Sequence, residues 1–590
     1  MPAIIVLEET KKEEFTMSIK KARNIGFAAT LLVMAILIGL LSVSAAAAEP
    51  ASDATLTFSD GGITAAGASS GYKISGTELT IEEPGVYTVT GSASEGSVKV
   101  KKGVENVTLI LKDLDLASSS TAPLVIGKTS SATVYISGTV KLADLEDAST
   151  EDTSENFEGA AIKVKSGASL TITGSGTLTA DGSACKNGIK GASEATITVE
   201  SGTLNVLAAY NGLASDGELI IKGGTVSVAA GNDGIKSDPD DDDTVSKGNL
   251  TITGGKITVS AGDDAIKALC DVTIGTEGSA SGPIISVTGS TEGIEGARVF
   301  LNSGSGSITA SDDGVNAASS RSVSEIAVYI NGGTWTVNAG GDGIDAGGDS
   351  TANRGGSVYI NGGTTVVFGS ANGGNSALDC DTTCKYTGGT LLAIGMNGMA
   401  QTAEGTGLVF NTAVSGGDEL SIKTAGGAEL ISVTAAKSAN WIYFASDKLT
   451  SGESYTLFVN GRSAAAATAG RTSSGGGMAM GGRGGQMPGS GQMPGSGQMP
   501  GSGQMPGSGQ MPGNGQMPGN GQMPGSGQMP GNGQRPENGE RAGRGERSRN
   551  GQGSEGGQPA DGQKPEVLEG VGIFSPAKYG PFASTYSCLA

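Results

Sequence analysis

The sequence predicts an all-β protein built as a parallel β-helix, and three observations predict this class. Short runs rich in Val, Ile and Thr follow one another from Ala54 to Ile394, with almost no helical periodicity. Gly-Gly and Ala-Gly pairs separate these runs. Related segments also recur, among them IKGGTVSVAAGNDGIKS at 221–237, ITGGKITVSAGDDAIKA at 252–268 and INGGTWTVNAGGDGIDA at 330–346. Repetition of this kind is typical of solenoid proteins.

The first 48 residues have the features of a secretory signal peptide. Basic residues at 20–23 precede an apolar run at 25–43, and three alanines at 46–48 form a small-residue cleavage site. Met17 fits the start of such a signal better than Met1 does. We therefore expect a protein that is secreted, either released or associated with the cell surface, with no membrane span in the mature chain.

Charge and cysteine content restrict the function. Residues 1–48 hold five basic and four acidic side chains, so the remaining chain carries a formal charge of −22, against −21 for the whole sequence. A chain this acidic is not expected to bind nucleic acid. It would also repel an acidic polysaccharide unless a cation mediates. The five cysteines are too few for a disulfide scaffold; Cys380 and Cys384 could form a bridge or be buried thiols.

The repeat unit consists of a strand, a Gly-Gly corner, a second strand, an Ala-Gly corner and a short third strand. Aligned on the third strand, successive units lie 21 to 34 residues apart. The longer intervals imply loops inserted at a corner, such as 238–247. The aligned apolar residues are Ile162, Ile189, Leu213, Ile235, Ile266, Ile294, Val315, Ile344 and Leu378.

We divide the chain into a signal peptide at 1–48, a β-helix at 54–396, a small β module at 397–462 and a low-complexity tail at 463–563. The tail contains repeated QMPGSG and QMPGNG units, and its composition predicts a disordered spacer. Residues 564–590 remain unassigned.

Several segments in this order resemble a known family. They are GVYTVTG at 85–91, VTLILKDLDL at 107–116, the NGIK, DGIK and DAIK segments, and NGMAQ at 397–401. The chain resembles secreted bacterial carbohydrate-binding proteins whose fold is a right-handed parallel β-helix similar to that of pectate lyases. The resemblance implies binding of cellulose or acidic sugars and bound calcium, without established catalysis.

A line of acids is predicted where the third strands begin. Equivalent residues of a β-helix stack about 4.8 Å apart, and two unit charges at that spacing repel by roughly 1 kcal/mol in bulk water. Calcium, which accepts several oxygen ligands, would offset this repulsion. The predicted ligands are Asp233, Asp263, Asp264, Glu292, Asp312, Asp313, Asp342 and Asp345.

The acids can also be interpreted without calcium, in two ways. Asp-Gly and Asn-Gly pairs form turns without any metal. Lys236 and Lys267 could also neutralise part of the line, but later repeats have no lysine at this position. Calcium is therefore most needed from Glu292 to Asp345.

A second predicted line faces outward on the first strand of each unit and ends in Phe300, Tyr329 and Tyr359. Such aromatic strips suit sugar rings, whose C–H faces stack on them. Alternatively, a corner loop such as 347–356 covers them. Trp335 aligns with core positions instead.

Three function classes fit these features. The first is a monomeric protein that binds plant cell-wall polysaccharide, either cellulose or an acidic polymer such as polygalacturonate. This class agrees with the predicted secretion, the predicted calcium ligands and the family resemblance. The second is a calcium-dependent polysaccharide lyase with Lys236 or Lys267 as the base. The third is a structural surface or adhesion protein, for which only the repetitive tail argues. The chain has no histidine for any catalytic step.

Overall fold

The computed structural model describes residues 48–154, 156–239, 248–319, 323–348 and 355–474. These residues form 43 strands and a single 3₁₀ turn, η1 (Ala148–Thr150). None of their helical structure has the length and apolar character that a membrane crossing needs. The predicted signal peptide up to residue 47, most of the 238–247 loop, the QMPG repeats and residues 564–590 lie outside the described residues.

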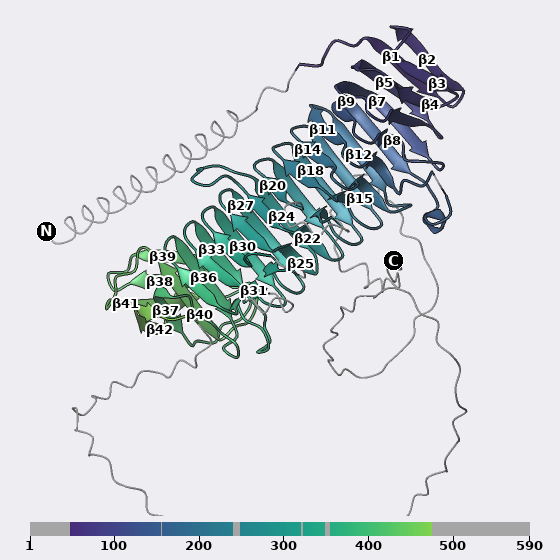
Figure 1. The fold of residues 1–590 in the computed structure, drawn as a ribbon. Coiled ribbons are helices and arrows are strands. Elements are labelled where there is room, and N and C mark those ends of the chain that lie inside the picture. Colours follow the sequence, from purple (N-terminus) through teal and green to yellow (C-terminus); the bar gives the residue numbers. More distant parts are fainter. Residues whose placement is uncertain (1–47, 155, 240–247, 320–322, 349–354, 475–590) are drawn as a thin grey trace, which may run out of the picture. The chain divides into compact units, whose positions relative to one another are not determined.

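A unit of three strands repeats along the chain (Figure 1). The first strands are β11 (Ser169–Gly174), β14 (Thr196–Val199), β17 (Glu218–Ile221), β20 (Leu250–Ile252), β23 (Asp271–Ile274), β26 (Arg298–Leu301), β29 (Ala327–Ile330), β32 (Ser357–Ile360) and β35 (Thr383–Tyr386). The second strands are β12 (Thr177–Gly182), β15 (Thr203–Ala208), β18 (Thr225–Ala230), β21 (Lys256–Ser260), β24 (Ile284–Gly289), β27 (Ser305–Ala310), β30 (Thr334–Ala339), β33 (Thr364–Phe368) and β36 (Thr390–Gly395). The third strands are β10 (Ala160–Val164), β13 (Asn187–Gly191), β16 (Leu213–Ser215), β19 (Ile235–Ser237), β22 (Asp264–Ala268), β25 (Glu292–Gly296), β28 (Val315–Ala318), β31 (Ile344–Gly348) and β34 (Leu378–Cys380).

Each strand pairs in parallel with the same strand of the next unit. Thus β17 pairs with β20, β18 with β21 and β19 with β22. The first and second strands belong to a 26-stranded sheet and the third strands to a 13-stranded sheet. The register predicted for the third strands is confirmed throughout, from Ile162 opposite Ile189 to Ile344 opposite Leu378.

The N-terminal part leads into this repeat. Its strands are β1 (Ala54–Ser59), β2 (Gly62–Gly67), β3 (Tyr72–Ser75), β4 (Glu78–Ile81), β5 (Gly85–Ala93), β6 (Ser97–Val100), β7 (Val107–Ser118), β8 (Leu124–Ile126) and β9 (Ser131–Asp144). Two antiparallel hairpins, β1 with β2 and β3 with β4, precede the parallel neighbours β5, β7 and β9. The long strand β9 then pairs with both β11 and β12, which starts the repeat.

The Gly-Gly corners have a steric cause. The second glycine of each pair adopts a positive φ, for example +90° at Gly255. A Cβ atom at Gly255 would also lie 2.8 Å from the carbonyl oxygen of Gly224, the equivalent corner of the preceding unit. Only glycine combines this backbone conformation with such close stacking, so the corner recurs with the repeat.

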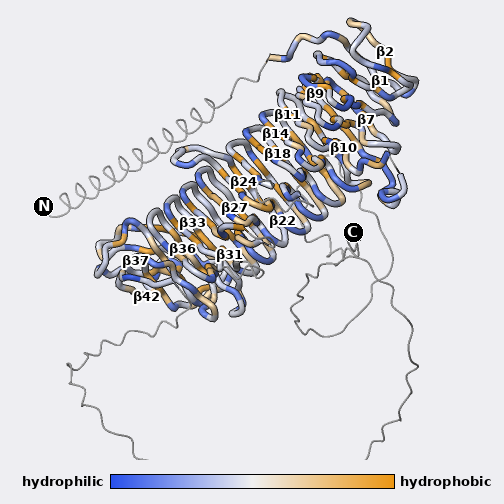
Figure 2. Tube along the Cα trace, viewed as in Figure 1, coloured by the Kyte–Doolittle hydropathy of each residue, from blue (hydrophilic) through white to orange (hydrophobic). Residues whose placement is uncertain are grey.

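The core is formed by the inward-facing residues of all three strand classes. Burial alternates along strands such as β12 and β15, and apolar and polar residues alternate accordingly in Figure 2. Ile235, Ile266 and Ile294 are fully buried, and burial of one such side chain contributes roughly 1.5–3 kcal/mol. Trp335 is likewise fully buried, as predicted. Its ring occupies space left by Gly306, where a Cβ would lie 2.7 Å from the indole.

The C-terminal strands are β37 (Gly405–Phe410), β38 (Glu419–Thr424), β39 (Glu429–Thr434), β40 (Trp441–Ser446), β41 (Ser454–Val459), β42 (Arg462–Thr468) and β43 (Gly470–Thr472). Strands β38, β39, β41 and β42 form a four-stranded antiparallel sheet, whereas β37, β40 and β43 join the large sheet. The predicted start of the tail at 463 is therefore wrong, because residues 462–472 pair as strands. A second apolar core joins Phe368 and Ile394 to Ile442 and Phe444.

Cys185, Cys380 and Cys384 are buried thiols without a disulfide. For the pair Cys380 and Cys384, the structure therefore agrees with the buried-thiol alternative.

Candidate functional site

The predicted line of acids forms the edge at which the third strands begin. We call it the acidic column: Asn187, Asn211, Asp233, Asp264, Glu292, Asp313 and Asp342. Asp233 and Asp264 are 2% exposed, whereas the doubled acids Asp263 and Asp312 face solvent. In each doubled pair the second acid is thus more buried than the first, and the carboxylates of Asp263 and Asp264 still lie within 4.8 Å of each other.

The glycine that follows each column residue is required by packing. A Cβ at Gly314 would lie 2.1 Å from Val337 Cγ1, and a Cβ at Gly343 would lie 2.2 Å from Val367 Cγ1. Neither glycine has a positive φ, so neither forms a left-handed turn. Close packing against the second strand, and not a left-handed backbone, therefore accounts for the glycines at these two positions.

Column side chains bond to the backbone of the next unit. Asn211 Oδ1 accepts a hydrogen bond from the backbone N–H of Asp233 at 3.2 Å, and Asp233 Oδ1 accepts one from Asp264 N–H at 3.3 Å. Asp313 Oδ1 accepts from Asp342 N–H at 2.6 Å, and Asp342 Oδ1 accepts from Ser376 N–H at 2.5 Å. One oxygen of each of these acids is thus used by the fold, and the second oxygen remains for another partner.

Lysines supply that partner in the first acidic units. Lys236 Nζ lies 3.0 Å from Asp233 Oδ2, and Lys267 Nζ lies 2.5 Å from Asp264 Oδ2 and 2.8 Å from Glu295 Oε1. Two compact carboxylate groups also occur here: Asp233, Asp263 and Asp264, and Asp264, Glu292 and Glu295. Because the lysines already compensate these groups, they need a metal ion less than their spacing suggests.

Glu292 is hydrogen-bonded to Glu295 and not paired with a lysine. Burial raises the pKa of Glu292, and the hydrogen bond and charge of Glu295 raise it further. Burial would also raise the pKa of Glu295, but its hydrogen bond to Glu292 and the adjacent Lys267 lower it. Asn316 Nδ2 also donates to Glu292 Oε2 at 2.8 Å.

The last acidic units have no basic partner within ion-pair distance among the described residues. Burial raises the pKa of Asp313 to about 7, that of Asp342 to about 6 and that of Asp345 to about 8, and neighbouring carboxylates add to each shift. Asp379 and Asp381 contribute to this repulsion around Asp345. The acids without a basic partner therefore lie in the units toward Asp345, where the sequence has no lysine after the column position.

The carboxylates of Asp312 and Asp313 approach one another beside Gly341. A Cβ placed on Gly341 would lie 2.3 Å from Asp312 Oδ1, 2.5 Å from Asp313 Oδ1 and 3.0 Å from Asn375 Nδ2. The two carboxylate oxygens therefore lie no more than about 4.8 Å apart, which is within the span that one calcium ion bridges. Turning the Asn375 amide over would present its oxygen beside them. We call this group of three side chains the Gly341 cradle, and its donor set fits a hard cation.

The structure brings the three predicted aromatic residues together but turns their faces toward one another. The ring centroids of Phe300 and Tyr329 lie 5.1 Å apart with an interplanar angle of 5°, and those of Tyr329 and Tyr359 lie 4.9 Å apart at 11°. Both faces of Tyr329 are thus covered by rings, whereas Phe300 and Tyr359 each have one face covered in this stack. Arg298 also lies over the Phe300 ring, 5.5 Å from its centroid. Ring edges remain available, and the Tyr329 hydroxyl donates to Glu325 at 2.7 Å.

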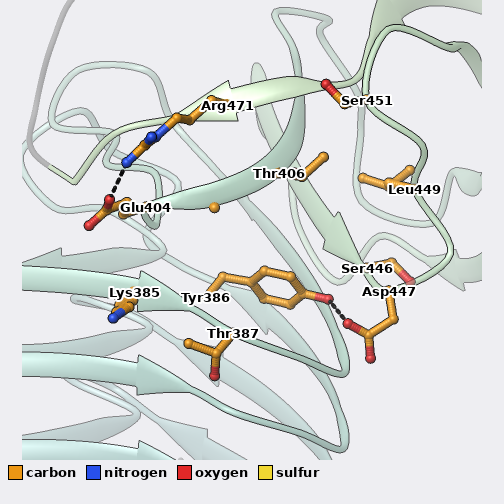
Figure 3. Close-up of a pocket in the computed structure, with 11 residues that line it drawn as sticks. Lys385, Tyr386, Thr387, Glu404, Thr406, Ser446, Asp447, Leu449, Ser451 and Arg471 are labelled. Atoms are coloured by element: carbon orange, nitrogen blue, oxygen red, sulfur yellow. Dashed lines mark hydrogen bonds and ion pairs between the residues drawn. The ribbon is translucent and has the colours of Figure 1, made fainter.

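Sequence reasoning missed a pocket of about 500 Å³ lined by residues of β35, β37, β40 and β43 (Figure 3). The Tyr386 hydroxyl donates to Asp447 Oδ1 at 2.9 Å, and Arg471 pairs with Glu404 at 2.7 Å. Asp447, Glu404 and Arg471 are already used in these contacts, and Lys385 is the fourth charged residue of the lining. Its residues come from separate strands, which leaves no local sequence signal.

The fold and the acidic column define a repetitive all-β protein with carboxylates concentrated along one edge. A model of the family described as carbohydrate-binding domain-containing protein matches residues 75–325 and 323–470, so the chain belongs to that family. A solved structure described as a polysaccharide lyase-like protein from C. thermocellum, in a gadolinium derivative, is similar to part of the chain. It shares 28% identity over 40% of this chain and 90% of the other, with a TM-score of 0.34. No curated protein matches.

Proposed function

We propose that the chain is a secreted carbohydrate-binding protein that recognises plant cell-wall polysaccharide on a right-handed parallel β-helix stabilised by calcium. Membership of the carbohydrate-binding family over most of the described residues is the observation that carries this proposal. Cellulose and acidic polymers such as polygalacturonate are the polysaccharides we propose as ligands.

Calcium has two roles in this proposal. It offsets the repulsion among Asp312, Asp313, Asp342 and Asp345, which have no lysine partner in the part of the chain that the structure describes, and the Gly341 cradle is where we place it. It also bridges the protein to uronate carboxylates, because a chain with a charge of −22 after residue 48 does not attract an acidic polymer directly.

The aromatic residues have a smaller role than open ring faces would give them. In this proposal Phe300, Tyr329 and Tyr359 contact neutral polysaccharide through their ring edges and through the Tyr359 hydroxyl. Stacking of a sugar ring between them is left out, because the rings already stack on one another.

The geometry disfavours the lyase alternative. A lyase base must be unprotonated, but Lys236 and Lys267 lie in ion pairs with Asp233 and Asp264. Burial alone would lower the pKa of each lysine, yet the adjacent carboxylates outweigh it and raise both pKa values. Both lysines are therefore held as cations and act as counter-charges.

Affinity electrophoresis in polygalacturonate and pull-down on insoluble cellulose, each with calcium or with chelator, test the proposal. We expect Asp313→Asn to weaken the calcium-dependent retardation in polygalacturonate and to leave cellulose retention unchanged. Asp115→Asn, which removes the same charge at an exposed site outside the column, is the matched control. Full retardation after chelation would contradict the cation bridge, and release of unsaturated uronate products would restore the lyase alternative.

A further inference from the structure

Three polar side chains that the proposed function does not use meet beyond the end of β9. Asp144 is the last residue of β9, Glu146 follows two residues later, and Cys185 lies in the turn between β12 and β13. One carboxylate oxygen from each acid and the thiol sulfur lie within 4.8 Å of one another. The exposed fractions of the three residues are 0%, 4% and 7%, so the cluster is closed to solvent.

The hydrogen bonds of this cluster are incomplete at one atom. Glu146 accepts the backbone N–H groups of Glu158 and Gly159, at 3.1 and 2.9 Å. Asp144 Oδ1 accepts the N–H of Glu146 at 2.9 Å. Asp144 Oδ2, in contrast, is buried without a hydrogen-bond partner, and the Asp144 carboxylate contacts the Cys185 thiol. A buried carboxylate oxygen without a donor is costly.

Positive charge is also missing at this cluster. Among the described residues, no ion pair reaches Asp144 or Glu146. The nearby Lys165 pairs with Glu158, and Lys186 pairs with Glu151. Two buried carboxylates that share a site in this way require either protons or a cation.

We propose that Asp144, Glu146 and Cys185 bind a divalent cation of the zinc class. A thiolate together with two carboxylates suits a borderline-soft metal, whereas calcium takes oxygen ligands alone. Zinc bonds of about 2.0–2.3 Å place tetrahedral ligands roughly 3.5 Å apart, so any donors that lie farther apart, up to 4.8 Å, would close inward on binding. The thiol proton leaves to solvent as the sulfur–metal bond forms.

The consequence for the fold is local. The segment 145–159, which carries η1, is held at one end by the hydrogen bonds to Glu146 and would be fixed to the 182–187 turn by the metal. The cluster lies in the first repeat units and shares no residue with the acidic column, so it is a second, chemically different cation site.

Cobalt(II) and zinc binding to the full-length chain test this site, in excess calcium so that all-oxygen sites are filled. We expect a near-ultraviolet thiolate-to-cobalt charge-transfer band that zinc abolishes. The band should be lost in Cys185→Ser and retained in Cys270→Ser, a buried thiol outside the cluster. Absence of the band from the wild type, or its persistence in Cys185→Ser, would overturn the proposal.

A measurement on the unmodified protein avoids any folding defect of the variants. The alkylation rate of Cys185, followed by peptide mass spectrometry, should fall about tenfold at a zinc concentration ten times the dissociation constant. Glu146→Gln, whose amide oxygen still accepts the loop N–H groups, should lose this protection. An alkylation rate that zinc does not change in the wild type would refute the site.

Discussion

Replacing Gly341 by alanine should remove the calcium dependence of thermal unfolding. The added methyl carbon would stand 2.3 Å from Asp312 Oδ1 and 2.5 Å from Asp313 Oδ1, so both carboxylates would have to leave the arrangement in which they share the proposed cation. Gly341 has no positive φ, so alanine is compatible with its backbone. The carboxylates that must move are flexible side-chain ends, and the substitution leaves the net charge unchanged.

The size of the effect follows from binding linkage. Calcium at 100 times its dissociation constant stabilises the native state by about 2.7 kcal/mol. An unfolding entropy of about 2.1 cal/mol/K per residue over roughly 400 cooperatively unfolding residues converts this into a shift of about 3 °C. We expect that shift in the wild type, and almost none in Gly341→Ala. Gly373→Ala is the matched control, because a Cβ there meets nothing within 4 Å.

Differential scanning fluorimetry with calcium and with chelator measures these shifts. Asp313→Asn tests whether the change in melting temperature reverses between chelator and calcium. Its amide oxygen still accepts the Asp342 N–H, but its charge is gone. In chelator this variant should melt above the wild type, since repulsion is relieved, and in calcium below it. An undiminished calcium shift in Gly341→Ala would refute the placement of the cation.

Three further predictions concern other parts of the molecule. Burial would raise the pKa of Glu95, but the Ser119 N–H and the hydroxyls of three serines lower it to about 2. The stabilising contribution of Glu95 should therefore be complete above about pH 4.5 and be lost as the pH falls toward 2. In Glu95→Gln, the free energy of unfolding in urea should vary less with pH over that range. Trp335→Ala should cost about 3–5 kcal/mol in urea unfolding, and Gly306→Ala should also destabilise, because its methyl would overlap the indole. Tyr359→Phe should reduce cellulose retention more than Tyr329→Phe, whose lost hydroxyl already bonds to Glu325; equal retention in both would exclude the Tyr359 hydroxyl as a contact.

Strand register could be predicted from the sequence because it follows from alternation. A one-residue slip would move every inward Ile and Val to the outer face, so the repeats fix their own alignment, and the outward line ending in Phe300, Tyr329 and Tyr359 is confirmed. The ring orientation could not be predicted. Strand spacing of about 4.8 Å is also a favourable distance for stacked rings, so the three rings stack on one another.

Contacts between segments that are far apart in the sequence could not be predicted either. Asp144 and Cys185 belong to different units, and neither lies in a recognisable motif. The role of the Asp-Gly pairs was hidden for a related reason. Glycine after aspartate suggests a turn, whereas the observed cause is Val337 or Val367 on the second strand, which leaves no room for a Cβ at Gly314 or Gly343.

The acidic column shows why acids recur although they repel. At Asp233 and Asp313 one carboxylate oxygen accepts the N–H of the next unit, a bond that an amide could also make, as Asn211 does. The charge is therefore not needed for the fold, and its cost is met differently along the column. Lysine neutralises Asp233 and Asp264, and at Glu292 burial and the hydrogen bond to Glu295 raise the pKa. Asp313 has no lysine partner among the described residues, and burial raises its pKa to about 7. The cation that we propose beside Gly341 accounts for a second acid, Asp312, at this position, because it would offset the repulsion that protonation otherwise removes.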